Sequence, residues 1–180
     1  MENLYHIKFD RYSEFSYNII KILVERGKDL WKLLKYNTAD ALEKEDLTDE
    51  EKFNLIYAGQ SDSEGYRVFR IPFTDDASTS QVCRLHIFPW VTDPYKRTNG
   101  FQTFMFQIVC HNKIGTLNDG RARCDVLIEE LGRIINGADV AGIGMLTFDS
   151  SNGRPDYLKQ RTWNNQSYFG YEFALTTGIA

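Results

Sequence analysis

The spacing of hydrophobic residues changes once along the chain, near residue 66, and this change constrains the fold more than any other feature. In the first part, apolar residues recur at helical spacing, and residues 12–26 and 29–36 each predict a helix. The capping box Thr48-Asp49-Glu50-Glu51 predicts that a third helix starts there. These helices are short and separated by polar turns, so we expect residues 1–60 to form a helical region packed on a larger unit.

After residue 66, apolar and polar residues alternate with a period of two, as they do in half-buried strands. The expected order is β-β-β-α-β-β: strands at 66–72, 83–88 and 101–111, a helix at about 120–135, and strands at 143–149 and 168–177. The pattern is typical of a meander, and the strand at 101–111 is apolar enough to be central or packed on both faces. The predicted fold class is therefore α+β, with N-terminal short helices, an antiparallel sheet and one helix packed on it over residues 66–180.

Composition places the chain among ordinary globular proteins. Its 180 residues suit one domain, and an aromatic content of 14% argues against disorder. The net charge of −4 implies no global affinity for nucleic acid or membrane surfaces.

The lack of recognisable targeting signals and the cysteine content both predict a cytoplasmic protein. The N-terminus has no basic segment followed by an apolar run, and the longest nearly apolar stretch, 101–110, is too short to span a membrane. Three cysteines (Cys83, Cys110 and Cys124) leave one unpaired in any disulfide scheme. We expect reduced thiols in a protein that is made in a cytoplasm.

A search for catalytic chemistry finds no convincing motif. Cys110 precedes His111, but neighbouring side chains on a strand point to opposite faces, so this pair is not expected to form a nucleophilic dyad. Zinc-ligand spacing and phosphate-binding loops are absent from the sequence. We predict no enzyme activity, no catalytic, cofactor-binding or metal-binding residues, and no cofactor.

Two arginines near the expected helix at 120–135 leave an alternative open. Arg121 and Arg123 could meet an anion at the helix N-terminus, or they could pair with Asp119 and Asp125, which we favour.

Three elements are candidates for contacts with other proteins. Residues 150–167 form a long polar stretch that contains Arg154, Lys159, Arg161, Tyr157 and Trp163. Unstructured loops of this length are usually functional or become ordered against a partner. The breaker-rich turn at 92–100 and Trp90 are the other two elements. For each of the three elements, the alternative to a contact role is an ordinary solvent-exposed loop or an aromatic side chain at the rim of the molecule.

The order of elements resembles that of phage neck and tail-completion proteins, particularly tail terminators. The matching stretches are Cys83-Arg84-Leu85-His86-Ile87, Phe101 to His111, Gly120 to Gly137, and the pair Ile143 to Asp149 with Tyr168 to Thr177. Residues 29–36 also resemble segments of phage connector proteins. The helical first third differs from the smallest terminators, and head-closure and adaptor proteins carry such additions.

The resemblance implies a structural virion protein that forms a ring, with six subunits as the expected number, between the portal and the tail tube. It would end tail-tube growth and join the tail to the head, with DNA only passing through the lumen. Its partners would be copies of itself and other neck, portal or tail-tube proteins, with no membrane, after assembly in the host cytoplasm. A ring subunit needs sheet edges, loops and exposed aromatics for its contacts, and the chain offers these.

Three alternatives rank below this one. The nearest is a head-closure (stopper) or adaptor protein bound to the portal. A metal-dependent hydrolase would use acids such as Asp75, Asp76 and Asp149. A host-directed binding module would be a stable monomer that captures one cellular partner.

Overall fold

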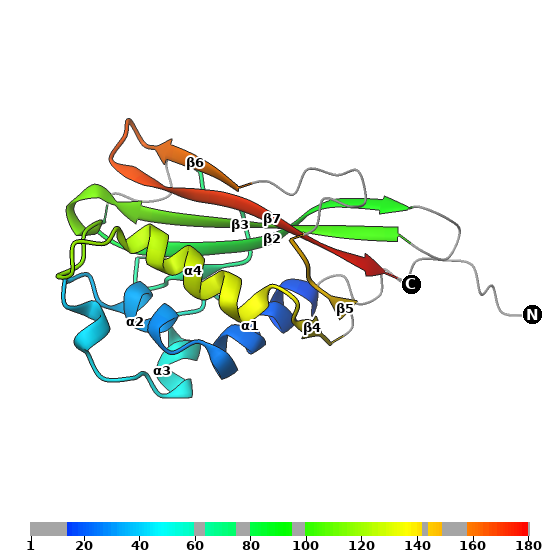
Figure 1. The fold of residues 1–180 in the computed structure, drawn as a ribbon, viewed down its shortest axis with the longest axis horizontal. Helices are drawn as coiled ribbons and strands as arrows, with labels where there is room; N and C mark the ends of the chain where they lie inside the picture. Colours follow the sequence, from blue (N-terminus) through cyan, green and yellow to red (C-terminus); the bar gives the residue numbers. More distant parts are fainter. Residues whose placement is uncertain are drawn as a thin grey trace, which may run out of the picture.

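The computed structural model describes residues 14–59, 64–74, 80–94, 100–141, 144–148 and 158–179, and it confirms the α+β class. A long, twisted sheet forms one layer, and helices cover one of its faces (Figure 1).

Three strands of 12 residues each form the centre of the sheet: β2 (Cys83–Pro94), β3 (Gly100–His111) and β7 (Tyr168–Ile179). They are antiparallel neighbours in the order β1-β2-β3-β7-β6. All but two side chains of β3 are buried, because helices cover one face and the segment around Phe73 covers part of the other. The prediction of a central strand at 101–111 is confirmed.

The first strand departs from the predicted meander. β1 is only Val68–Phe69, and it runs parallel to β2 rather than antiparallel. A parallel partner requires a connection of about a dozen residues that returns the chain to the same end of the sheet. Fourteen positions separate Phe69 from Cys83, which is enough for such a connection. The spacing of apolar residues within each strand carries no signal for the relative direction of the two strands.

The predicted strand at 143–149 is wrong in extent and in partner. Its strand portion is β5 (Gly144–Met145), which pairs with β4 (Asp139–Val140) in a separate two-stranded sheet. Gly144 has φ +86°, so the chain leaves the extended conformation at the residue where a long strand would begin. Thr147 then makes an isolated bridge to Thr176 of β7.

An unpredicted strand lies inside the stretch assigned to a loop. β6 (Leu158–Trp163) pairs with β7 along its length and forms one edge of the sheet. Its middle four residues are polar and exposed, so it lacks the hydrophobic alternation on which the prediction relied. A turn at 164–167, with positive φ at three residues, connects β6 to β7.

The predicted helices are present with small shifts of their ends. They are α1 (Phe15–Arg26), α2 (Asp29–Lys35), α3 (Asp49–Asn54) and α4 (Arg123–Ile135), with short 3-10 helices at Ala41–Glu43 and Asn112–Ile114. The capping box is confirmed: the Thr48 hydroxyl accepts from the Glu51 backbone N–H, and the Glu51 carboxylate accepts from the Thr48 backbone N–H.

One buried cluster joins the helices to the sheet. Leu23 of α1, Leu33 of α2 and Leu131 of α4 share this cluster with Ile87 and Phe106 of the sheet. Helix α4 lies beside the N-terminal helices on the same face of the sheet: α4 contacts β3 and β7, whereas α1 and α2 contact β2, and both of them also contact α4. The residues of the helical region and of the mixed core therefore bury their apolar side chains together.

Candidate assembly interface

Trp90 lies at an irregularity of β2. The strand does not end at Pro89 as expected but continues to Pro94, with a register shift between Pro89 and Val91 that leaves Trp90 as the extra residue of a bulge. Its side chain is 49% exposed. Bulges commonly redirect a side chain next to a functional surface. This position fits the expected contact role, which remains a prediction.

The outer edge of β2 carries more apolar surface. β1 pairs only with Leu85 and His86, so beyond them β2 has no strand neighbour on that side among the described residues. Val91 is exposed at this edge, and Ile71 is exposed in the segment that follows β1. Of the predicted contact turn at 92–100, Thr92 to Pro94 end β2 and Gly100 begins β3, while residues 95–99 lie outside the described residues.

The second part of the predicted contact loop at 150–167, from Leu158 on, is held to the sheet. Arg161 donates from Nε to Glu172 Oε2 at 2.7 Å, and Gln107 donates to the other Glu172 oxygen at 2.8 Å. Trp163 is half-buried, with its ring centroid 6.0 Å from that of Phe73. Arg161 and Trp163 therefore help to hold the fold, whereas Arg154 and Tyr157 lie outside the described residues.

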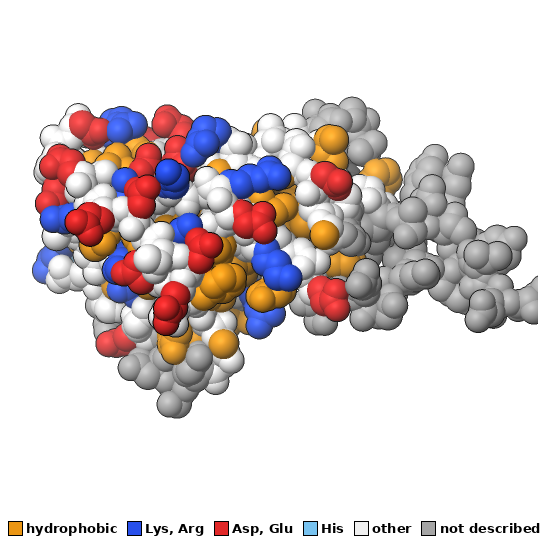
Figure 2. All heavy atoms as spheres, turned by 90° about the horizontal axis from the view of Figure 1, so that it is seen from below, with side chains coloured by type: hydrophobic (Ala, Val, Ile, Leu, Met, Phe, Trp, Pro, Cys, Tyr) orange, Lys and Arg blue, Asp and Glu red, His pale blue; other side chains and the backbone are white. Residues whose placement is uncertain are grey.

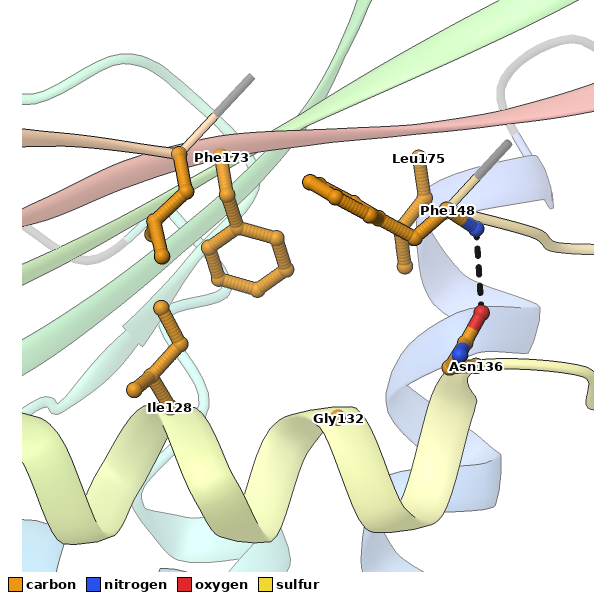
Figure 3. A pocket seen from close by; sticks show the side chains of 7 residues that line it. Ile128, Gly132, Asn136, Phe148, Phe173 and Leu175 are labelled. Atoms are coloured by element: carbon orange, nitrogen blue, oxygen red, sulfur yellow. Dashed lines mark hydrogen bonds between the residues drawn. The ribbon is translucent and has the colours of Figure 1, made fainter. Parts of the chain in front are cut away.

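An apolar groove opens between α4 and the sheet where β6 begins. It has a volume of about 210 Å³, and its wall consists of Ile128, Gly132, Asn136, Phe148, Leu158, Phe173 and Leu175 (Figure 3). Asn136, the residue directly after α4, accepts a 3.0 Å hydrogen bond from the Phe148 backbone N–H and so holds Phe148 beside the helix. The groove is smaller than the roughly 300–1,000 Å³ of small-molecule sites and suits a single large side chain.

Exposed apolar side chains surround this groove. Phe148 is 49% exposed and Leu158 is 53% exposed, and both residues line the groove. Large exposed apolar side chains at an apolar groove are typical of interaction sites. The sequence did not predict the groove, because the residues of the groove come from four separate segments. The only sequence signal was an apolar residue on each side of a polar stretch, Phe148 before it and Leu158 after it.

The thiols do not form a reactive site. Cys83 and Cys110 are cross-strand partners, and Cys124 lies on α4; all three are buried and free. The hydrogen bond with Cys110, together with burial, raises the pKa of Cys83 well above its usual value. The Cys110 thiol donates to the His111 carbonyl oxygen, and the imidazole of His111 accepts from the Lys113 backbone N–H. The predicted separation of Cys110 and His111 is therefore confirmed.

His86 is buried on the face of the sheet opposite the helices. Its ring stacks on Phe69 with centroids 4.8 Å apart, and Nδ1 lies 2.8 Å from the carbonyl oxygen of Ile71. A carbonyl oxygen only accepts, so Nδ1 carries the proton of the neutral ring. Burial lowers the pKa of His86 to about 4.

Acidic residues give no support to a metal centre in the described part of the chain. Within it, no three His, Cys, Asp or Glu side chains are grouped so that they could hold a metal ion. Asp75, Asp76 and Asp149, the acids of the hydrolase alternative, lie outside the described residues.

The two arginines near α4 behave differently from each other. Arg121 pairs with Asp119 at 2.7 Å, as favoured from the sequence. Arg123 does not pair with Asp125: it is fully buried and donates to the carbonyl oxygens of Ile114, Leu33, Tyr36 and Thr38 at 2.7–2.8 Å. Arg123 therefore joins the C-terminal end of α2 to the start of α4.

Surface charge is mixed on the helical face. Figure 2 shows acidic and basic side chains interspersed there, with apolar side chains between them. Such a face carries no single-sign field for nucleic acid. No helix in the described ranges is long and apolar enough to cross a membrane.

Comparison with known families assigns the chain. Residues 28–177 match the family described as YomW, which is most of the sequence. The chain belongs to the YomW family. The family name derives from an SPBeta-like Bacillus prophage and indicates a phage-related protein, in agreement with the phage resemblance of the sequence. No curated protein matches the chain.

Proposed function

We propose that this YomW-family protein is a structural subunit of the phage neck. In this role, copies form a ring, with six as the expected number, that ends the tail tube and joins the tail to the portal. The protein contributes surfaces rather than chemistry, and DNA passes through the lumen.

The observation that carries the proposal is the presence of two different apolar surfaces beside opposite edges of one sheet. Trp90 and Val91 lie at the outer edge of β2, and the groove bounded by Phe148 and Leu158 lies beside β7 and the start of β6. A closed ring with head-to-tail contacts needs two unlike surfaces on each subunit.

Two measurements test this function. Light scattering over a concentration series, with negative-stain images of the same sample, should show closed rings. Labelling of the protein in intact virions should then place it at the head–tail junction. A label found only outside the virion would contradict the neck role, whatever the protein does in solution. The same labelling separates a terminator beside the tail tube from a stopper or adaptor on the portal.

A further inference from the structure

We propose that Cys83 and Cys110 form a disulfide bond between β2 and β3 once the protein leaves a reducing environment. The occasion for this oxidation rests on the proposed function, because a virion protein folds in the reducing host cytoplasm and is later released into an oxidising medium. Cys124, the third cysteine, stays reduced. The register of the two strands and the contacts among the three thiols support this pairing.

Cys83 and Cys110 are direct partners across the antiparallel pair β2–β3. Such partners alternate between hydrogen-bonded and non-hydrogen-bonded pairs. The His111 backbone N–H donates to the Val82 carbonyl oxygen at 3.1 Å, so these two residues form a hydrogen-bonded pair. Cys83 and Cys110, one position along, therefore form a non-hydrogen-bonded pair. The Leu85 backbone N–H donates towards β1 and not to β3, which agrees with this alternation.

A non-hydrogen-bonded pair has the spacing that a disulfide needs. Its Cα atoms lie about 4.5 Å apart, and its side chains are closer than those of a hydrogen-bonded pair. Disulfides span Cα separations of roughly 4.4–6.8 Å. Cys83 and Cys110 belong to the same buried cluster, and their thiols hydrogen-bond to each other. The disulfide can therefore form without a change in strand register.

Cys124 of α4 supplies the competing thiol. The thiol of Cys110 is also hydrogen-bonded to that of Cys124. Cys124 reaches the cluster from a helix, however, and its thiol donates to the carbonyl oxygen of Phe169 on β7. Only Cys83 lies directly across the strand ladder from Cys110. The strand register therefore favours Cys83 as the partner of Cys110.

The closed fold protects the three thiols from oxidants. All three side chains are fully buried, and the hydrogen bond with Cys124, together with burial, raises the pKa of Cys110. Thiol–disulfide exchange requires an accessible thiolate. Cys83 is the first residue of β2, and Cys110 is the last residue but one of β3. The pair therefore lies at one end of the ladder, and it becomes reactive when this end opens or while the chain folds.

A small disulfide such as oxidised glutathione is the oxidant. The thiolate of one cysteine attacks a sulfur of oxidised glutathione, and one glutathione thiolate leaves. The second protein thiolate then attacks the protein sulfur of this mixed disulfide and expels the second glutathione. Two protein thiols are thereby oxidised to one disulfide, and one glutathione disulfide is reduced to two thiols.

The disulfide would stabilise the β2–β3 hairpin. It closes a loop that contains the β2 bulge at Trp90 and the turn between the two strands. Closing this loop restricts the unfolded chain, so the oxidised protein should melt several degrees higher than the reduced protein.

The test refolds the full reduced chain in buffers of reduced and oxidised glutathione, in urea below the unfolding midpoint, where the strands open repeatedly. Free thiols are then blocked with iodoacetamide, and mass spectrometry locates the disulfide. Trypsin cuts after Arg84 and Lys113 and so places the three cysteines in separate peptides. We expect a disulfide between the peptides of Cys83 and Cys110, and a blocked thiol at Cys124.

Oxidation of the same chain in concentrated urea is the matched control. The stretch from Cys110 to Cys124 is about half as long as that from Cys83 to Cys110, and shorter loops close more often in an unfolded chain. The Cys110–Cys124 bond should therefore exceed the Cys83–Cys110 bond by about threefold in this control. The variant Cys124→Ala removes the competing thiol. It should still form the Cys83–Cys110 bond and melt several degrees higher when oxidised, and dithiothreitol should reverse both effects.

Three results would overturn the pairing. Three free thiols in the most oxidising buffer would show that the strands do not bring Cys83 and Cys110 within bonding reach. A dominant Cys110–Cys124 bond below the unfolding midpoint would show that the helix supplies the partner. Disulfides between separate chains would show that the thiols react only after the fold is lost. Each of these results would leave the neck function standing, whereas a label found only outside the virion would contradict that function and leave the pairing intact.

Discussion

Protonation of His86 should destabilise the protein in mildly acidic solution. The neutral ring donates from Nδ1 to the Ile71 carbonyl oxygen, and its Nε2 is buried with no hydrogen-bond partner among the described residues. A second proton would place a positive charge and an unpaired N–H in this apolar site, where Phe69 stacks on the ring. For this reason burial lowers the pKa of His86 from 6.5 to about 4.

The sign and size of the effect follow from linkage. The unfolded chain binds a proton at His86 below about pH 6.5, whereas the folded protein resists protonation until about pH 4, so stability falls as the pH decreases between these values. One pKa unit corresponds to about 1.4 kcal/mol, which gives a loss of about 2 kcal/mol at pH 5 and about 3 kcal/mol once both states are protonated.

Urea denaturation at pH 7, 6 and 5 measures this loss. The variant His86→Asn keeps a donor near the position of Nδ1 but cannot titrate. Its free energy of unfolding should therefore fall by about 2 kcal/mol less between pH 7 and pH 5 than that of the unsubstituted protein. The matched control is His111→Asn: His111 is only half-buried, and asparagine can still accept the Lys113 N–H bond. Equal pH dependence in the unsubstituted protein and His86→Asn would refute the reasoning.

Three further outcomes are expected. Gly170→Ala would place a Cβ 1.8 Å from the Ile108 carbonyl oxygen and should lower the free energy of unfolding by about 3 kcal/mol or more. The control Gly178→Ala in the same strand places a Cβ that meets no atom within 4 Å and should change the free energy of unfolding little. Thermal denaturation compares the two variants. Arg123→Met leaves four carbonyl oxygens without their donor and should cost roughly 4 kcal/mol or more in urea denaturation, whereas Arg121→Met removes only an exposed ion pair and should cost at most about 1 kcal/mol; similar losses would contradict the role assigned to the buried guanidinium. The three buried thiols should react with a thiol reagent slowly in the native protein and fully in urea, and rapid labelling of any one in the native state would contradict its burial.

The sequence alone predicted the elements whose own side chains repeat with a clear period. The helices bury one face of their own residues, and the two long strands that contain Phe106 and Phe173 carry an apolar side chain at every second position, so their spacing reveals them. The Thr48 capping box is equally local, because both of its hydrogen bonds lie within four residues. The α+β class followed from these elements.

Tertiary structure decided the features that depend on neighbours distant in the chain. β6 is a strand because β7 supplies its hydrogen bonds, and its polar residues carry no periodic signal. The parallel direction of β1 is defined only by its pairing with β2, and the two residues of β1 carry no signal for it.

The candidate interface shows the same division. The sequence marked Trp90 as an aromatic beside a turn, but the bulge that exposes its side chain depends on the register between β2 and β3. The groove exists because α4, β6, β7 and Phe148 approach one another, and no one of these segments contains it. Local side-chain chemistry therefore determined which elements form. The packing of distant segments decided which apolar side chains remained at the surface. The burial of a side chain depends on the segments that pack against it and not on its neighbours in the sequence.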